Sequence, residues 1–306
     1  MSMGIDSECE KTLMMLKRRQ AERAGDPADV PQVPPKAPAE WAWRHMQIVG
    51  GEQYVQATRC EPYERGCAAC HRLGGYIEVS TDGYRTITDC PDCRLLIQRI
   101  KLINAARLPA KFHQRQYDWR QVRIDQERSP KAAMMAWVQD IADSYQQGHE
   151  QDVPSLCFAG PTGVGKSHAA YELAKAALAN DVPVRWLNWI TLLDQLRASF
   201  RDKAEHTARE TWASVLRNPK GVLIIDDLGA GSVTAYSRGV ACDLFERVPP
   251  HVRLIVTTNG VPNSDGEHSL DNMVGSRAAS RLHGVCGRGD TMLHFHGKDW
   301  RKGAVL

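Results

Sequence analysis

Residues 156–179 read LCFAGPTGVGKSHAAYELAKAALA, and this stretch decides the fold of the chain. Its centre, Gly160 to Ser167, matches the pattern G-x-x-x-x-G-K-S, in which backbone N–H groups of a glycine-rich loop surround phosphate oxygens. An apolar run (156–159) precedes the loop, and an alanine-rich stretch (168–179) follows it. A strand, a glycine loop and a helix in this order are the context that the pattern requires. The stretch therefore predicts a phosphate-binding loop, with a chance glycine-rich turn as the alternative.

Each part of this loop has an expected role. We expect Lys166 to reach the β- and γ-phosphates of a nucleotide and the Ser167 hydroxyl to bind Mg²⁺. The start of the following helix adds a dipole that favours negative charge. The expected nucleotide contacts in the loop are Gly160, Pro161, Thr162, Gly163, Val164, Gly165, Lys166 and Ser167.

Two further apolar runs end in polar side chains. Residues 222–227 read VLIIDD, a strand that ends in two carboxylates. We expect Asp226 to hold Mg²⁺ and Asp227 to orient or deprotonate an attacking water. Residues 254–259 read LIVTTN, a second buried strand, after which Asn259 can hydrogen-bond the γ-phosphate or the water. The alternative for the acidic pair is a strand capped by acids that only face solvent.

The chain from about residue 108 alternates short apolar runs with longer amphipathic stretches. The runs are residues 155–159, 184–187, 222–225 and 254–257. Such runs are typical of buried parallel strands joined by crossover helices, with ligands at the carboxyl ends of the strands. The pattern predicts an α/β fold with a parallel sheet flanked by helices.

A cluster of cysteines precedes this region. The spacing Cys67-x2-Cys70-x19-Cys90-x2-Cys93 fits the zinc pattern C-x2-C-x15–20-C-x2-C, in which four thiolates complete a tetrahedron. Cys60 and His71 are spare candidates that can replace one of the four. Buried cysteines without metal and a redox pair are the alternatives. We expect a small domain stabilised by Zn²⁺ bound to Cys67, Cys70, Cys90 and Cys93.

Composition and patterning complete the expected organisation of the 306 residues. We expect a helix within residues 1–24, a proline-rich linker over 25–40, the zinc-binding module over 41–105 and the α/β domain over 106–306. The formal net charge of +3 is small, so any contact with DNA must come from a local patch. No stretch approaches the ~20 apolar residues of a membrane span, and no signal peptide is recognisable, so we expect a cytoplasmic protein with no membrane partner.

The P-loop, DDLG, VTTN and the segment 275–283 (GSRAASRLH) together resemble the AAA+ ATPases. Among these, the chain resembles the DnaC/DnaI helicase loaders and the related IstB transposition ATPases, from about Leu108 to Arg301. The resemblance implies ATPase activity with Asn259 as sensor 1. It also implies an arginine finger that reaches the nucleotide of a neighbouring subunit, with Arg281 as the first candidate and Arg277 as the second. Arg301 is a candidate sensor 2 residue, and each arginine can instead belong to a solvated helix face.

The resemblance implies an ATP-dependent loader of a replicative DNA helicase onto single-stranded DNA, with ATP, Mg²⁺ and Zn²⁺ as cofactors. Partners would be the helicase, single-stranded DNA and further copies of the chain. The basic and aromatic stretch 197–203 is a candidate DNA contact. One alternative is an IstB-like transposition ATPase that binds duplex DNA and a transposase, although the zinc module favours the loader. Another is a nucleotide-dependent scaffold with little hydrolysis, because Asp227 stands where many AAA+ proteins have Glu.

Overall fold

A computed structural model describes the parts of the chain on which the fold depends. The described residues are 46–59, 75–79, 85–113, 115, 117–125, 129–147, 153–201, 221–249, 251–261, 266, 269–286 and 291–300. The chain divides into two compact units, one of residues 1–49 and 56–101 and the other of residues 50–55 and 102–306. The expected N-terminal helix and proline-rich linker lie outside the described residues.

The first unit contains two small sheets. Strands β1 (Met46–Gly50) and β2 (Val55–Arg59) form one of them. Strands β3 (Gly75–Val79) and β4 (Arg85–Asp89) form an antiparallel pair in which Ile77 lies opposite Ile87. Helix α4 (Pro91–Ala106) follows directly after β4.

The second unit is built on a six-stranded sheet in the order β5-β10-β6-β9-β8-β7. Its parallel strands are β6 (Leu156–Ala159), β7 (Val184–Asn188), β8 (Gly221–Leu228), β9 (Val252–Thr258) and β10 (Met292–His296). Only the two-residue edge strand β5 (Arg123–Ile124) is antiparallel to its neighbour, with Ile124 opposite Phe295. The predicted α/β fold with a mostly parallel sheet is confirmed.

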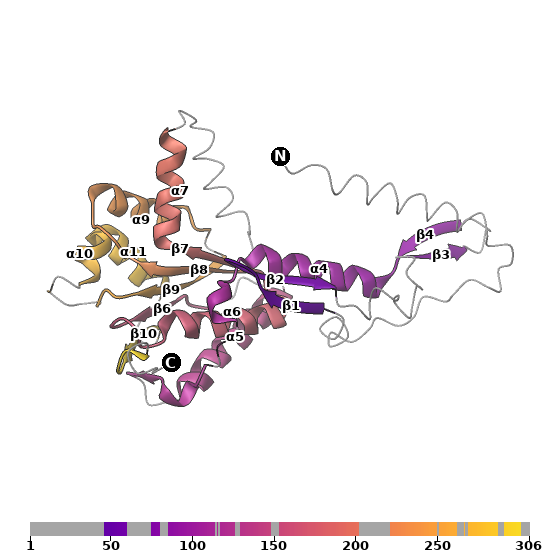
Figure 1. Ribbon diagram of the computed structural model, residues 1–306, viewed down its shortest axis with the longest axis horizontal. Helices are drawn as coiled ribbons and strands as arrows, with labels where there is room; N and C mark the ends of the chain where they lie inside the picture. Colours follow the sequence, from indigo (N-terminus) through magenta and orange to yellow (C-terminus); the bar gives the residue numbers. More distant parts are fainter. Residues whose placement is uncertain are drawn as a thin grey trace. The chain divides into compact units, whose positions relative to one another are not determined.

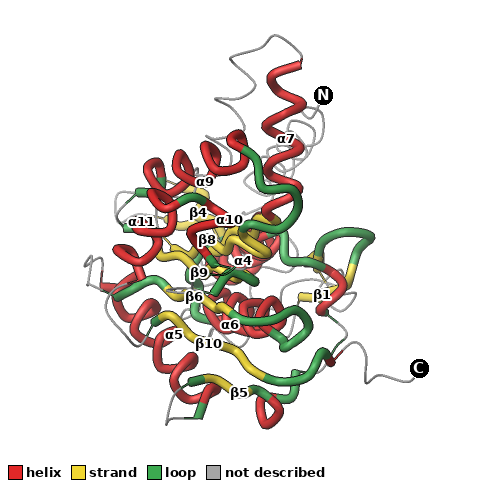
Figure 2. Tube along the Cα trace, turned by 90° about the vertical axis from the view of Figure 1, so that its left-hand side faces the viewer, coloured by secondary structure: helices red, strands yellow, loops and turns green. Residues whose placement is uncertain are grey.

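Helices cover both faces of this sheet (Figure 1). Helices α5 (Pro130–Gln147) and α6 (Lys166–Ala179) pack on one face. The opposite face carries α7 (Trp189–Arg201), α9 (Ala235–Arg247), α10 (Leu270–Val274) and α11 (Ser276–Cys286). Short 3-10 turns, η2 (Ala110–Phe112) and η3 (Trp119–Gln121), lie between α4 and β5. The tube in Figure 2 shows strands β10, β6, β9 and β8 side by side.

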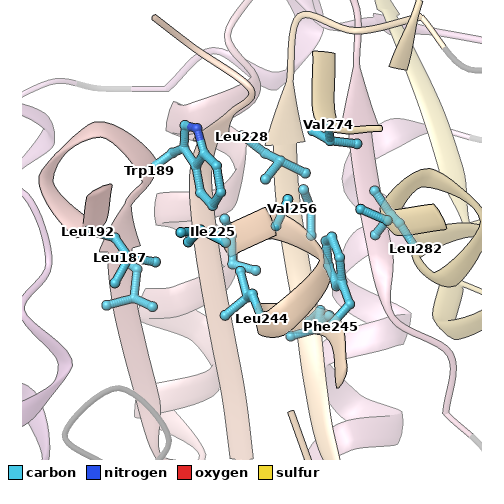
Figure 3. Close-up of a cluster of buried hydrophobic side chains, with 14 of the residues drawn as sticks. Leu187, Trp189, Leu192, Ile225, Leu228, Leu244, Phe245, Val256, Val274 and Leu282 are labelled. Atoms are coloured by element: carbon cyan, nitrogen blue, oxygen red, sulfur yellow. The ribbon is translucent and has the colours of Figure 1, made fainter. Parts of the chain in front are cut away.

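The core under α9 and α11 follows from the alternation of side chains along the strands. Leu223 and Ile225 of β8 belong to one buried cluster with Leu244 of α9 and Leu282 of α11 (Figure 3). Ile224, which lies between them, is also fully buried but faces the other layer, because successive side chains of a strand point to opposite faces. A strand buried on both faces is apolar throughout, which is why residues 222–225 read as a continuous apolar run.

Candidate active site

The glycine-rich loop lies between β6 and α6 in the central part of the sheet. Gly160 has φ = 138° and Gly163 has φ = 83°, values that residues with a Cβ atom rarely adopt. A Cβ atom on Gly160 would also collide with the backbone carbonyl group of Phe295 on the neighbouring strand β10. The loop therefore needs glycine at these positions, both for its turn and for the close approach of β10.

Lys166 is held at the mouth of the loop by three acceptors. Its ammonium group donates to the backbone oxygens of Gly160, at 2.8 Å, and Pro161, at 2.7 Å. It also donates to Oδ1 of Asn259 at 2.9 Å. Asn259 follows β9, which pairs directly with β6. The structure thus brings together a lysine and an asparagine that are 93 positions apart in sequence.

A carboxylate and three hydroxyl or amide groups meet at the end of β8. The Oδ1 atom of Asp226 accepts a hydrogen bond of 2.8 Å from the Thr257 hydroxyl, and the Ser167 hydroxyl also bonds this carboxylate. The same Thr257 oxygen accepts a hydrogen bond of 2.9 Å from the backbone N–H of Asp227. Burial and the neighbouring charge of Asp227 raise the pKa of Asp226. A buried carboxylate of this kind favours a cation beside it, and Ser167 and Asp226 supply the oxygen ligands that Mg²⁺ prefers.

Asp227 has an unusual backbone. Its φ of 58° lies in the left-handed region, which non-glycine residues occupy only a few per cent of the time. The pairing of β8 with β9 shifts between Ile225 and Leu228, so β8 carries an extra residue at this point. Such a bulge redirects the side chains of the strand. At this irregularity Asp226 is buried and Asp227 is half-buried.

Aromatic side chains surround the far end of the loop. The Tyr117 hydroxyl donates to the carbonyl oxygen of Gly165 at 3.1 Å, and the backbone N–H of Trp300 donates to the carbonyl oxygen of Gly163 at 3.0 Å. The ring centroid of Tyr117 lies 4.6 Å from that of His168 and 5.6 Å from that of Trp300. Burial raises the pKa of Tyr117, so its hydroxyl keeps its proton and remains a donor. These rings enclose the loop beside the point where α6 begins.

Both arginine-finger candidates lie on α11 and bind one acid. Arg277 and Arg281 form ion pairs with Glu246 of α9, and their side chains are 72% and 40% exposed. In the described part of the chain, neither guanidinium group is hydrogen-bonded to the P-loop. Arg301, the sensor 2 candidate, is outside the described residues.

The expected zinc ligands are described only in part. Cys90 and Cys93 are buried at the start of α4. Cys67 and Cys70, together with the spare candidates Cys60 and His71, lie outside the described residues. Within the described ranges, no group of three or more His, Cys, Asp or Glu side chains is arranged to hold a metal ion. The zinc site therefore stays a prediction.

The expected DNA-contact stretch lies largely on α7. Arg197 forms an ion pair of 3.5 Å with Asp194, and its guanidinium group lies 5.2 Å from the ring centroid of Tyr236. Residues 202 and 203 of the same stretch are outside the described residues. Arg197 has partners within the domain, so its contact with DNA stays a prediction.

Sequence reasoning missed two residues that bind predicted site residues. Thr257 bonds both acidic residues of β8, yet a threonine in a strand is ordinary and gives no signal of its own. Glu246 binds both arginines from a different helix, and its role could only have been found once α9 and α11 were known to be adjacent. Both residues act through contacts between segments distant in sequence.

Comparison with known proteins identifies the family to which the part of the chain around this site is similar. Residues 94–262, more than half of the 306-residue chain, match the protein family described as IstB-like ATP binding protein. The ATP-binding protein of insertion sequence IS5376 from Geobacillus stearothermophilus is 28% identical over 129 residues, which is 42% of this chain and 49% of that protein. The match thus spans about half the length of this curated relative. The family match covers β6 to β9, the part of the chain that carries the loop, both acids and Asn259.

Two solved structures resemble the fold. The crystal structure of the DnaC helicase loader has a TM-score of 0.42 and 18% identity, over 57% of this chain and 93% of that chain. The crystal structure of DnaI has a TM-score of 0.43 and 17% identity, over 63% of this chain and 93% of that chain. Among the described residues of the present chain, no helix has the length and apolar character needed to cross a membrane.

Proposed function

This chain belongs to the family of IstB-like ATP-binding proteins, and from that premise we propose that it binds and hydrolyses Mg²⁺-ATP as a switch for a DNA-associated partner. The observation that carries the proposal is the convergence of Lys166 at the start of α6, Asn259 after β9 and Asp226 on β8. These residue types, at the carboxyl ends of parallel strands next to a glycine loop, fit the binding of a nucleoside triphosphate.

We assign the following roles to the residues of the site. Backbone N–H groups of the loop bind phosphate oxygens, and Lys166 exchanges its backbone acceptors for the β- and γ-phosphates. Ser167 and Asp226 hold Mg²⁺, which when bound neutralises charge on the phosphates. Asn259, which is hydrogen-bonded to Lys166, is placed to contact the γ-phosphate.

Asp227 is the proposed acceptor for the proton of the attacking water. It is half-buried and follows directly on the buried Asp226, at a point where the backbone is left-handed. Aspartate is one methylene shorter than glutamate, so the distance over which it must reach the water is larger. We infer slow hydrolysis that suits a switch between ATP and ADP states.

The site is completed in the proposed assembly by an arginine from a neighbouring copy. Arg281 is the first candidate and Arg277 the second, because both side chains are partly exposed on α11 and, among the described residues, share the single acid Glu246. An arginine at the γ-phosphate stabilises charge that develops during phosphoryl transfer. Hydrolysis would then depend on oligomerisation.

As the biological role, we propose loading of a replicative helicase onto single-stranded DNA. The ATP state would hold the helicase open on DNA, and hydrolysis would release it. The cysteine-rich segment supports this reading, as a separate zinc-bound module can contact a partner while the ATPase domain changes state. We propose that Cys67, Cys70, Cys90 and Cys93 bind one structural Zn²⁺. Metal analysis of the purified chain should give about one zinc per protein, and none after all four cysteines are replaced by serine.

One observation favours a second candidate function. The relative from Geobacillus stearothermophilus is an insertion-sequence protein, which fits a transposition ATPase that binds duplex DNA and a transposase. Both roles use the same nucleotide site, so only the partner separates them.

The decisive experiment is a pull-down with purified replicative helicase in ATP and in ADP, using the natural chain and Lys166→Ala. Helicase binding that changes with nucleotide and is altered in Lys166→Ala supports the loader. Absence of helicase binding, together with ATP-dependent assembly on duplex DNA, supports the transposition role. An ATPase assay with and without single-stranded DNA tests hydrolysis itself. If no hydrolysis is seen under any condition, the result favours the nucleotide-dependent scaffold.

A further inference from the structure

Two arginines of α11 share a single oxygen atom. Arg277 Nη2 lies 2.8 Å and Arg281 Nη2 lies 2.9 Å from the same atom, Oε1 of Glu246. The Cys242 thiol, one turn earlier on α9, donates to this oxygen at 3.5 Å. One carboxylate therefore faces two guanidinium groups, and within the described residues no second carboxylate is paired with either arginine.

The helices that carry these groups are fixed by packing. Leu244 and Phe245 of α9 and Leu282 of α11 belong to the same buried core, and Figure 3 shows their side chains between the two helices and the sheet. Helix α11 begins directly after Gly275, whose φ of 88° turns the chain out of α10. The packing holds the backbone positions of Glu246 on α9 and of Arg277 and Arg281 on α11 relative to one another.

Stability does not explain this arrangement. The side chains of Arg277 and Arg281 are 72% and 40% exposed, and that of Glu246 is 34% exposed. Exposed ion pairs contribute only about 0–1 kcal/mol to folding. The arginines beside the cluster have other partners, since Arg238 donates to the carbonyl oxygen of Asn272 at 2.8 Å. Both guanidinium groups are exposed enough for an anion from outside the subunit to reach them.

We propose that Glu246 is a positioning residue for the arginine that acts on the nucleotide of the neighbouring copy. This inference rests on the proposed hydrolysis between copies. Because both guanidinium groups use one oxygen, one of them can move to a phosphate while the other stays on the carboxylate. Glu246 is then never left unpaired, and the departing arginine is already oriented, which lowers the cost of ordering it during the reaction.

The test compares steady-state ATP hydrolysis by four full-length proteins under the conditions in which the natural chain is active. These are the natural chain, Glu246→Gln, Glu246→Asp and Asp243→Asn. Asp243 is the matched control, because it forms an exposed ion pair of 3.4 Å with Arg247 on the same helix but does not bind the arginines of α11. We expect Glu246→Gln to lower kcat about 3- to 10-fold with little change in the KM for ATP. Glu246→Asp keeps the charge and should recover part of the loss.

Three results would overturn the inference. They are an unchanged or higher kcat in Glu246→Gln, an equal loss in Asp243→Asn, or a loss explained by a lower thermal midpoint. Arg281→Ala and Arg277→Ala separate this failure from that of the proposed function. If either arginine variant hydrolyses no ATP while Glu246→Gln has the kcat of the natural chain, hydrolysis between copies is supported and the proposed role of Glu246 is wrong. If the natural chain hydrolyses no ATP at any concentration, both fall together.

Discussion

Thr257→Val removes one oxygen atom that serves both acidic residues of the site. The Thr257 side chain is fully buried. Its hydroxyl donates to the Asp226 carboxylate at 2.8 Å and accepts from the Asp227 backbone N–H at 2.9 Å. Valine has nearly the same shape, so the substitution deletes hydrogen bonds and leaves little cavity.

The expected cost follows from these two bonds. A hydrogen bond to a charged group contributes about 1.5–3 kcal/mol, and a buried N–H group without a partner costs about 1–3 kcal/mol. We expect the free energy of unfolding of Thr257→Val to fall by about 2–5 kcal/mol, since the two effects share one site and are not fully additive. Loss of a residue that orients a metal ligand lowers metal affinity about 10- to 100-fold, so Mg²⁺-dependent nucleotide binding should weaken by that factor.

The neighbouring residue provides the control. Thr258 is equally buried, and its hydroxyl donates to the Leu228 carbonyl oxygen at 2.9 Å and accepts from the Gly260 N–H at 3.0 Å. Thr258→Val therefore loses the same number of hydrogen bonds but none to a carboxylate. Urea unfolding should show comparable destabilisation of both variants. Titration of Mg²⁺ in the presence of ADP should show a large loss of affinity only in Thr257→Val.

Two results would refute this reasoning. Equal loss of Mg²⁺ affinity in both threonine variants would mean that general loosening of β9, not the bond to Asp226, controls the metal site. Unchanged stability of Thr257→Val would mean that the Asp227 N–H finds another acceptor.

Three further predictions concern the same domain. Burial raises the pKa of Asp226 above its ordinary 3.8. Between pH 3.8 and this raised pKa, the folded state binds more protons than the unfolded state. The free energy of unfolding of the nucleotide-free protein should therefore fall as the pH rises through this range. Urea unfolding of Asp226→Asn should no longer show this pH dependence, and its free energy of unfolding at neutral pH should be higher by about 0.5–2 kcal/mol. The same variant should not hydrolyse ATP. A lower free energy of unfolding would contradict this prediction. Tyr117→Phe loses the bond to Gly165 and should cost about 0.5–1.5 kcal/mol, with weaker nucleotide binding in a fluorescence titration; unchanged affinity would show that the hydroxyl is dispensable. Phe295→Ala removes a fully buried ring whose centroid is 5.1 Å from that of Phe158. Thermal unfolding should show that the free energy of unfolding falls by about 3–5 kcal/mol. A decrease below about 1 kcal/mol would mean that β10 contributes little to the core.

The sequence allowed the fold and the family to be predicted because their signals are local. The glycine loop of residues 160–167 and the apolar runs at 222–225 and 254–257 each report on a short segment, and strand periodicity places them in one parallel sheet. The family resemblance is confirmed by the match over residues 94–262. The expected roles of Lys166 and Asn259 stay predictions, although the two side chains are in direct contact.

The remaining features depend on three-dimensional neighbours or on backbone geometry. Nothing in the letters DD indicates that Asp227 adopts a φ of 58°, because the bulge arises from the pairing of β8 with β9. The aromatic enclosure joins Tyr117 and Trp300, which are far apart in the sequence. Glu246 is one of many acidic residues on amphipathic helices, and only the packing of α9 against α11 distinguishes it.

The position of β10 in the sheet has a consequence for synthesis of the protein on the ribosome. Strand β6 carries the phosphate loop and lies between β9 and β10, but β10 is translated more than a hundred residues later. Until it emerges, one edge of β6 has no partner, and Gly163 lacks the N–H group of Trp300. A nascent or truncated chain therefore exposes a hydrophobic strand edge, which is prone to aggregation.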